Sequence, residues 1–125
     1  MTVLDAIKRF DDETENDIPI ELKKEWLSEI DKKIAKEINY CRSGLSEEAY
    51  TFEKADDFML CAIDSYSEIY IVYLTMKMNY MLAEIERYNN SANIFNRLYY
   101  EMTNYISRNY KYNVKNSIKV ELNNV

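Results

Sequence analysis

The chain has 125 residues, which is enough for one domain but too few for two well-buried cores. Hydrophobic residues make up 47% and charged residues 30%, a composition that excludes a disordered chain. The formal net charge of −6 disfavours sequence-specific binding of nucleic acid, although a protein that only lets DNA pass would tolerate this sign.

Several kinds of catalytic and metal site are excluded by the residue types that the chain lacks. It has no histidine, the commonest metal ligand and general base, and its single glycine cannot make a glycine-rich phosphate loop. Cys41 and Cys61 alone cannot complete a four-ligand zinc site, and we interpret them as free cytosolic thiols. We therefore expect no catalytic, cofactor-binding or metal-binding residues, and a protein that is not an enzyme.

The first two predicted helices follow from capping and periodicity. Thr2 and Asp5 have the spacing of a capping box, which predicts a short helix through about Phe10 and an acidic loop after it. Pro19 fits the first turn of a second helix, because its missing N–H would be unpaired there. One face of that helix is apolar, and the helix ends near Gly44, which can take a left-handed conformation. The apolar positions are Leu22, Trp26, Leu27, Ile30, Ile34, Ile38 and Cys41.

Residues 45–63 have a weaker pattern, and we expect a long loop with an extended piece near residues 58–61. Connections of this length are uncommon in a compact domain unless they serve a purpose, such as packing on a neighbouring subunit.

The third predicted helix starts at a cap formed by Asp64 or Ser65 and is apolar nearly all round. Since the chain offers only two other long helices to cover it, we expect part of its surface to meet another copy or a partner. The candidate subunit-interface residues are Tyr66, Tyr70, Ile71, Leu74 and Met78. The twelve tyrosines suit such contacts, which stay partly exposed to solvent, although codon bias in a low-GC genome would explain their number equally well.

A fourth helix is predicted to begin near Asn89 to Ser91, whose side chains would cap it and fix the corner with the third helix. Its apolar face comprises Ile94, Phe95, Leu98, Tyr99, Met102, Tyr105 and Ile106. The short link makes helices three and four antiparallel neighbours. We thus predict an all-α fold, a small helical bundle with two long antiparallel C-terminal helices and a long loop after the second helix.

The last residues of the chain differ in character from the helices. We divide the chain into a helical domain, residues 1–111, and an extended C-terminal tail, residues 112–125. The even spacing of apolar residues in the tail is strand periodicity, and a strand without a partner in its own chain can add to a groove or sheet edge of another protein. The predicted partner-binding residues are Tyr112, Val114, Ile118, Val120 and Leu122.

Three segments together resemble a known family. They are "WLSEID" from Trp26 to Asp31, "YSEIYIVYL" from Tyr66 to Leu74 and "RYNNSANIFN" from Arg87 to Asn96. In this order and spacing the chain resembles the small head-tail connector proteins encoded in phages and prophages of Clostridia and other Firmicutes. The resemblance covers most of residues 3–110. It departs from the family pattern in the link between helices three and four, where Ala83 stands near a common glycine.

The resemblance implies a head completion, or adaptor, protein of the virion neck, assembled in the host cytoplasm. Such subunits form a homo-oligomeric ring of about a dozen copies under the portal protein, extend the DNA channel without sequence-specific binding, and dock a head-closure or tail-terminator protein. In related adaptors the C-terminal segment reaches the portal. No membrane association is expected, because the longest apolar region, residues 69–82, is interrupted by polar side chains.

Two alternatives remain open from the sequence. The first is a cytosolic helical regulatory module that binds a host protein through the third helix. The second is a single-strand nucleic-acid binder that uses the aromatic and basic segment "RNYKYNVK".

Overall fold

A computed structural model describes residues 1–113, and these form an all-α fold, as predicted. The helices are α1 (Val3–Glu13), α2 (Ile20–Ile34), α3 (Glu68–Met81) and α4 (Ile85–Asn109). A π-helical turn, η1 (Ala35–Asn39), extends α2, and a 3-10 turn, η2 (Asp64–Tyr66), precedes α3. The described residues contain no β-strand, only two isolated bridges.

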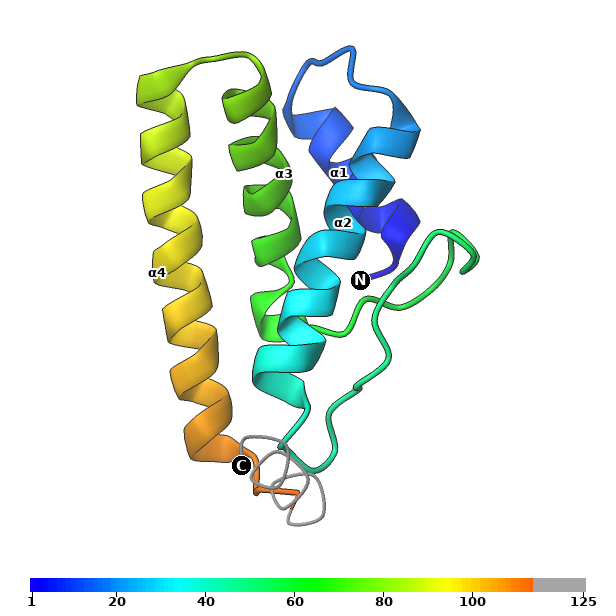
Figure 1. Cartoon of the computed structure of the whole chain (residues 1–125), viewed down its shortest axis with the longest axis vertical. Coiled ribbons are helices and arrows are strands. Elements are labelled where there is room, and N and C mark those ends of the chain that lie inside the picture. Colours follow the sequence, from blue (N-terminus) through cyan, green and yellow to red (C-terminus); the bar gives the residue numbers. More distant parts are fainter. Residues whose placement is uncertain (114–125) are drawn as a thin grey trace, which may run out of the picture.

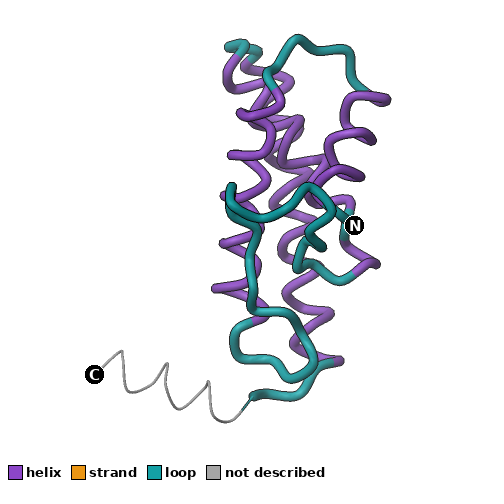
Figure 2. Tube along the Cα trace, turned by 90° about the vertical axis from the view of Figure 1, so that its right-hand side faces the viewer, coloured by secondary structure: helices purple, strands orange, loops and turns teal. Residues whose placement is uncertain are grey.

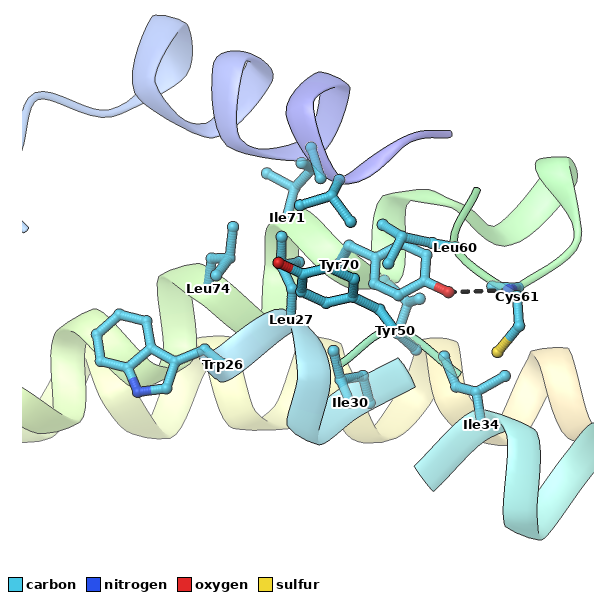
Figure 3. Close-up of a cluster of buried hydrophobic side chains, with 14 of the residues drawn as sticks. Trp26, Leu27, Ile30, Ile34, Tyr50, Leu60, Cys61, Tyr70, Ile71 and Leu74 are labelled. Carbon is cyan, nitrogen blue, oxygen red and sulfur yellow. Dashed lines mark hydrogen bonds between the residues drawn. The ribbon is translucent and has the colours of Figure 1, made fainter. Parts of the chain in front are cut away.

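Helix α3 occupies the middle of the bundle, with α4 on one side and α1 and α2 on the other (Figure 1). Its hydrophobic character has no single direction, so it can be covered on several sides at once. The fully buried side chains around it come from all four helices and include Phe10, Leu27, Ile30, Ile69, Tyr70, Leu74, Met102 and Ile106. Figure 3 shows Leu27, Ile30, Tyr70 and Leu74 among them. The core therefore surrounds α3, and the neighbouring helices each bury one face.

The capping box of the first helix is confirmed. Asp5 donates its backbone N–H to Thr2 Oγ1, and Thr2 donates its own to the Asp5 carboxylate, at 3.0 and 3.1 Å. The helix continues three residues beyond Phe10, to Glu13. Pro19 lies one residue before the first turn of α2, as its N-cap. Gly44 has a φ of +84°, which confirms the left-handed conformation expected there.

The predicted starts of α3 and α4 are wrong by a few residues. Asp64 and Ser65 form η2, and α3 begins at Glu68 with Ser67 before it. Helix α4 begins at Ile85, so Asn89 and Ser91 lie inside it rather than at its cap. The corner is instead a tight link in which Ala83 takes a φ of +56° and Glu84 donates its backbone N–H to Asn79 O.

The predicted long loop spans residues 40–63 and packs along α1 and α2. It begins earlier than the expected residue 45, because the second helix, extended by η1, ends at Asn39 and not near Gly44. Its outgoing half runs beside the N-terminus, where Val3 N–H donates to Phe58 O and Leu60 N–H donates to Met1 O, at 3.1 and 3.0 Å. Thr2 and Met59 form an antiparallel bridge, in the region where an extended piece was expected. Figure 2 shows the loop and the N-terminus on the side of the molecule away from α4. Within residues 1–113, no helix combines the length and the apolar character needed to cross a membrane.

Candidate functional site

The most concentrated polar arrangement is buried between α2, α3 and the long loop. Asp31 is fully buried, and its carboxylate accepts the hydroxyl of Tyr70 at 2.6 Å and the backbone N–H groups of Tyr50 and Cys61 at 2.8 and 2.9 Å. Tyr70 in turn accepts the backbone N–H of Ala62 at 2.8 Å (Figure 3). Both carboxylate oxygens of Asp31 therefore accept hydrogen bonds, as a buried carboxylate requires.

Two further side chains of the α2–η1 segment fasten the same loop. Ser28 Oγ donates to the carbonyl of Tyr50 at 2.9 Å, and Asn39 Nδ2 donates to the carbonyls of Ser46 and Cys61, both at 2.8 Å. Because these partners are backbone groups, the loop is held by its main chain and does not need strand pairing. We call Asp31, Ser28, Asn39, Tyr70 and Cys61 the loop anchor.

The chemical properties of the loop anchor fit a structural role and not a reactive one. Burial, and then the neighbouring charge of Asp31, raise the pKa of Tyr70 well above its usual value. The same two causes raise the pKa of the Cys61 thiol, which donates a hydrogen bond to Asp31 at 3.1 Å. Cys61 is thus a protonated, buried thiol at neutral pH, and such a thiol is a poor nucleophile. Among residues 1–113 no group of three or more His, Cys, Asp or Glu side chains is placed to hold a metal ion.

Four of the five residues that the sequence analysis assigned to a subunit interface are buried in the core of the single chain. These are Tyr70, Ile71, Leu74 and Met78, and only Tyr66 is half-buried. The expectation that these residues contact another subunit failed because it assumed that only the long helices could bury α3. The short α1 and the anchored loop supply the remaining surface. The burial of α3 is therefore internal and gives no argument for a neighbouring subunit at these residues.

Exposed apolar side chains instead gather at the corner between α3 and α4. Tyr80, Leu82 and Ile85 are 69%, 55% and 72% exposed, and Met81 is exposed beside them. A shallow pocket of about 280 Å³ lies here, lined by Asn79, Tyr80, Ala83, Glu84, Ile85 and Tyr88. We call Tyr80, Met81, Leu82 and Ile85 the apolar corner. Such a cluster is a common feature of protein-binding surfaces.

The base of the C-terminal tail is fixed at the opposite end of the bundle. The backbone N–H of Ser43 donates to Lys111 O at 2.8 Å, and that of Asn113 donates to Cys41 O at 2.7 Å. The guanidinium of Arg42 donates to Tyr110 O at 3.1 Å and lies 3.9 Å from the ring centroid of Tyr112. This short antiparallel pairing, together with the cation–π contact, holds residues 110–113 against residues 41–43.

The predicted tail residues are described only in part. Tyr112 is exposed except for its contact with Arg42. Val114, Ile118, Val120 and Leu122 lie outside the described residues, so their assignment to a partner contact stays a prediction.

Sequence reasoning missed the loop anchor, although one signal was available. Asp31 stands four residues after Leu27 and three before Ile34, so it occupies a core position of α2. An acidic residue at such a position has to find buried donors, and the chain supplies them from the loop and α3.

Comparisons with known proteins add no further information about the chain. No family model, no curated protein and no solved structure matches it.

Proposed function

We propose that the chain is a structural virion protein, a head-tail connector that forms a ring below the portal, extends the DNA channel and docks the next neck component. The resemblance of three segments supports this proposal, and the arrangement of the molecule adds a physical argument to it.

The proposal rests on the positions of two candidate partner-binding surfaces, the apolar corner and the base of the C-terminal tail. The apolar corner lies at one end of the α3–α4 pair, and the base of the C-terminal tail lies at the other end (Figure 1). Helix α4 has 25 residues and therefore separates them by about 37 Å. A protein that joins two components along one axis needs a binding surface at each end, and this chain has one candidate at each.

In this proposal the tail attaches to the portal, and the apolar corner receives the head-closure or tail-terminator protein. Arg42 has a positioning role, because it holds Tyr110 and Tyr112 at the base of the tail. The anchored loop keeps residues 41–43 in place as the partner of the tail base.

Binding to assembled portal particles tests the proposal. The portal gene is sought beside the gene of this chain, and the two purified proteins are mixed, sedimented and imaged. The full chain is expected to sediment with the portal and to add a ring of density to it. A chain that remains monomeric and separate from portal particles would contradict the connector role.

Two variants separate the roles of the ends. Deleting residues 113–125 is expected to leave the helices folded and to weaken portal attachment. Replacing Ile85 with Glu is expected to leave portal attachment unchanged and to block binding of the next neck protein. If the truncated chain joined portal particles with full affinity, the docking role of the tail would be wrong.

The alternative of a regulatory module that binds through the third helix has less support. The structure buries Tyr70, Ile71 and Leu74 of α3, so the surface on which that hypothesis depended is covered. Gene neighbourhood distinguishes the two: portal, protease and major capsid genes upstream favour the connector.

A further inference from the structure

We propose that copies of this chain bind side by side, with the outer face of α4 of one copy against the face formed by α1 and the long loop of the next. The inference rests on the proposed ring-forming function and names the surfaces that would make the ring.

The first surface is the side of α4 that points away from the core. The helix buries Ser91, Phe95, Met102 and Ile106, and the opposite side is exposed along most of its length. We define the α4 face as Asn90, Asn93, Arg97, Tyr100 and Arg108. Its centre is Tyr100, which is 68% exposed, and Arg97 and Arg108 lie within the next two turns on either side. An exposed aromatic ring flanked by Arg and Asn is a typical composition for a protein interface.

The second surface lies on the other side of the bundle. Residues 1–17 and 47–64, which supply α1 and most of the loop, contain twelve acidic side chains and only three basic ones, Lys8, Arg9 and Lys54. Lys23 and Lys24 of α2 pair with two of the acids, Asp11 and Asp56.

Other acids on this side remain available for a partner. Asp12, Glu53 and Asp57 are exposed and make no ion pair within residues 1–113. Leu4 and Met59 are 52% and 58% exposed and lie near one another, because Thr2 bridges Met59 and Leu4 N–H donates to Asp56 O. We define the acidic face as Leu4, Asp12, Glu53, Asp57 and Met59.

The two faces are complementary in charge and in position. Helix α4 carries Arg87, Arg97 and Arg108 against Glu86 and Glu101, so its net charge is positive in a chain whose total is −6. The acidic face belongs to α1 and the long loop, which lie on the far side of α3 from α4 (Figure 1). Both faces offer exposed apolar side chains within charged surroundings, and the charges are opposite in sign.

A second copy fits this arrangement better than nucleic acid does. The arginines of α4 are interspersed with Glu86 and Glu101, which would repel a phosphate backbone. Contact between two different faces of identical subunits is heterologous, and it closes into a ring when the rotation from copy to copy divides a full turn. It also leaves both ends of each bundle, the apolar corner and the tail base, free for partners above and below.

Charge reversal with compensation tests the contact. Self-association of the full chain is measured by sedimentation over a range of concentrations. The double variant Arg97→Glu with Arg108→Glu and the double variant Glu53→Lys with Asp57→Lys are each expected to weaken association by about ten-fold or more. An equimolar mixture of the two variants is expected to co-assemble, because the negative α4 face of the arginine variant meets the positive second face of the other variant, and the two unchanged faces also remain opposite in charge. One chain that carries all four changes has a negative α4 face and a positive second face, so it is expected to recover association. Raising NaCl from about 50 mM to about 500 mM should weaken the wild-type contact.

The matched control is Lys36→Glu, which reverses an exposed charge on η1, outside both faces. It is expected to associate like the wild type, and circular dichroism checks that every variant folds. The inference is overturned if the arginine variant associates as tightly as the wild type, if the four-fold variant shows no recovery, or if the wild type stays monomeric. It is also overturned if the arginine variant loses DNA binding rather than self-association. Portal binding is scored separately, so copies that associate through these faces but ignore the portal would refute only the connector role.

Discussion

The hydroxyl of Tyr70 on α3 donates a 2.6 Å hydrogen bond to the carboxylate of Asp31 on α2, and both side chains are fully buried. Because the same carboxylate accepts two backbone N–H groups of the long loop, a single side chain connects two helices and 24 residues of irregular chain, residues 40–63, to the core. The stability of the loop therefore depends on Asp31.

Replacing Asp31 with Ala is expected to lower the free energy of unfolding by about 3 kcal/mol, because three buried N–H and O–H donors and the Cys61 thiol lose their acceptor at once. Urea denaturation followed by circular dichroism measures the change. The matched control is Asp57→Ala, at an exposed loop position, which is expected to change stability by less than about 0.5 kcal/mol. Similar stabilities for the two variants would show that the carboxylate of Asp31 does not hold the loop.

Alkaline pH is expected to destabilise the protein through Tyr70. Burial and the charge of Asp31 raise the pKa of Tyr70 in the folded state, whereas in the unfolded chain it titrates near its usual value of about 10. Above that pH the unfolded state binds fewer protons than the folded state, so stability falls as pH rises; below it the contribution is fully present.

Tyr70→Phe should reduce this slope by up to about 1.4 kcal/mol per pH unit above about pH 10. The measurement is urea unfolding at a series of pH values from neutral to alkaline, for the wild type and the variant. Parallel curves for the two proteins above pH 10 would contradict the assignment.

The two cysteines should differ in reactivity. Cys61 is buried, donates to Asp31 and has a raised pKa, whereas Cys41 is half-exposed at the tail base. A thiol-specific chromophoric reagent is therefore expected to modify one thiol per folded chain, Cys41, and the second only on unfolding. Mass spectrometry of digested peptides identifies the modified residue, and Cys41→Ser is expected to abolish the fast phase. Fast modification of Cys61 in that variant would mean that the loop opens readily.

Those parts of the fold that depend on local pattern could be predicted from the sequence. The capping box at Thr2, the amphipathic face of α2 and the left-handed Gly44 each follow from a few neighbouring residues. The start of α4 could not, because Asn89, Asn90 and Ser91 have cap-forming side chains in isolation. Tertiary structure overrides that preference: Ser91 faces α3, where Asn79 needs a partner.

The candidate sites were less predictable for a related reason. The apolar sequence of α3 predicts that the helix is buried, but it does not show which segments bury it. The burying residues include those of α1 and of the long loop, whose own sequence patterns are weak. Asp31 required donors that only the folded chain brings near, from Tyr50, Cys61 and Tyr70. The apolar corner depends on where α3 ends, which is Met81, and the apolar run of the sequence continues past that residue to Leu82 and Ala83.

Asn79 is expected to contribute to helix packing, whereas Asn90 is not. Asn79 Nδ2 donates to Ser91 Oγ at 3.2 Å, and both side chains are buried between α3 and α4. Asn79→Ala should cost about 1–2 kcal/mol because Ser91 loses this partner and a small void forms. Asn90→Ala, one residue before Ser91 but exposed, should be neutral or slightly stabilising since Ala favours helix. Thermal and urea unfolding of the pair measure the difference, and equal losses would contradict an interhelical role for Asn79.

The link between α3 and α4 carries the one non-glycine residue of the described chain with a positive φ, Ala83 at +56°. This conformation costs an L-residue with a Cβ about 1 kcal/mol, a cost that glycine avoids, although glycine loses part of the gain through its greater freedom in the unfolded chain. Ala83→Gly is therefore expected to stabilise the protein by about 0.5 kcal/mol. The matched control is Ala92→Gly inside α4, where the same change should cost about 1 kcal/mol. Urea unfolding measures both variants, and a loss of stability at Ala83 as large as that at Ala92 would show that the corner does not hold Ala83 in the left-handed conformation.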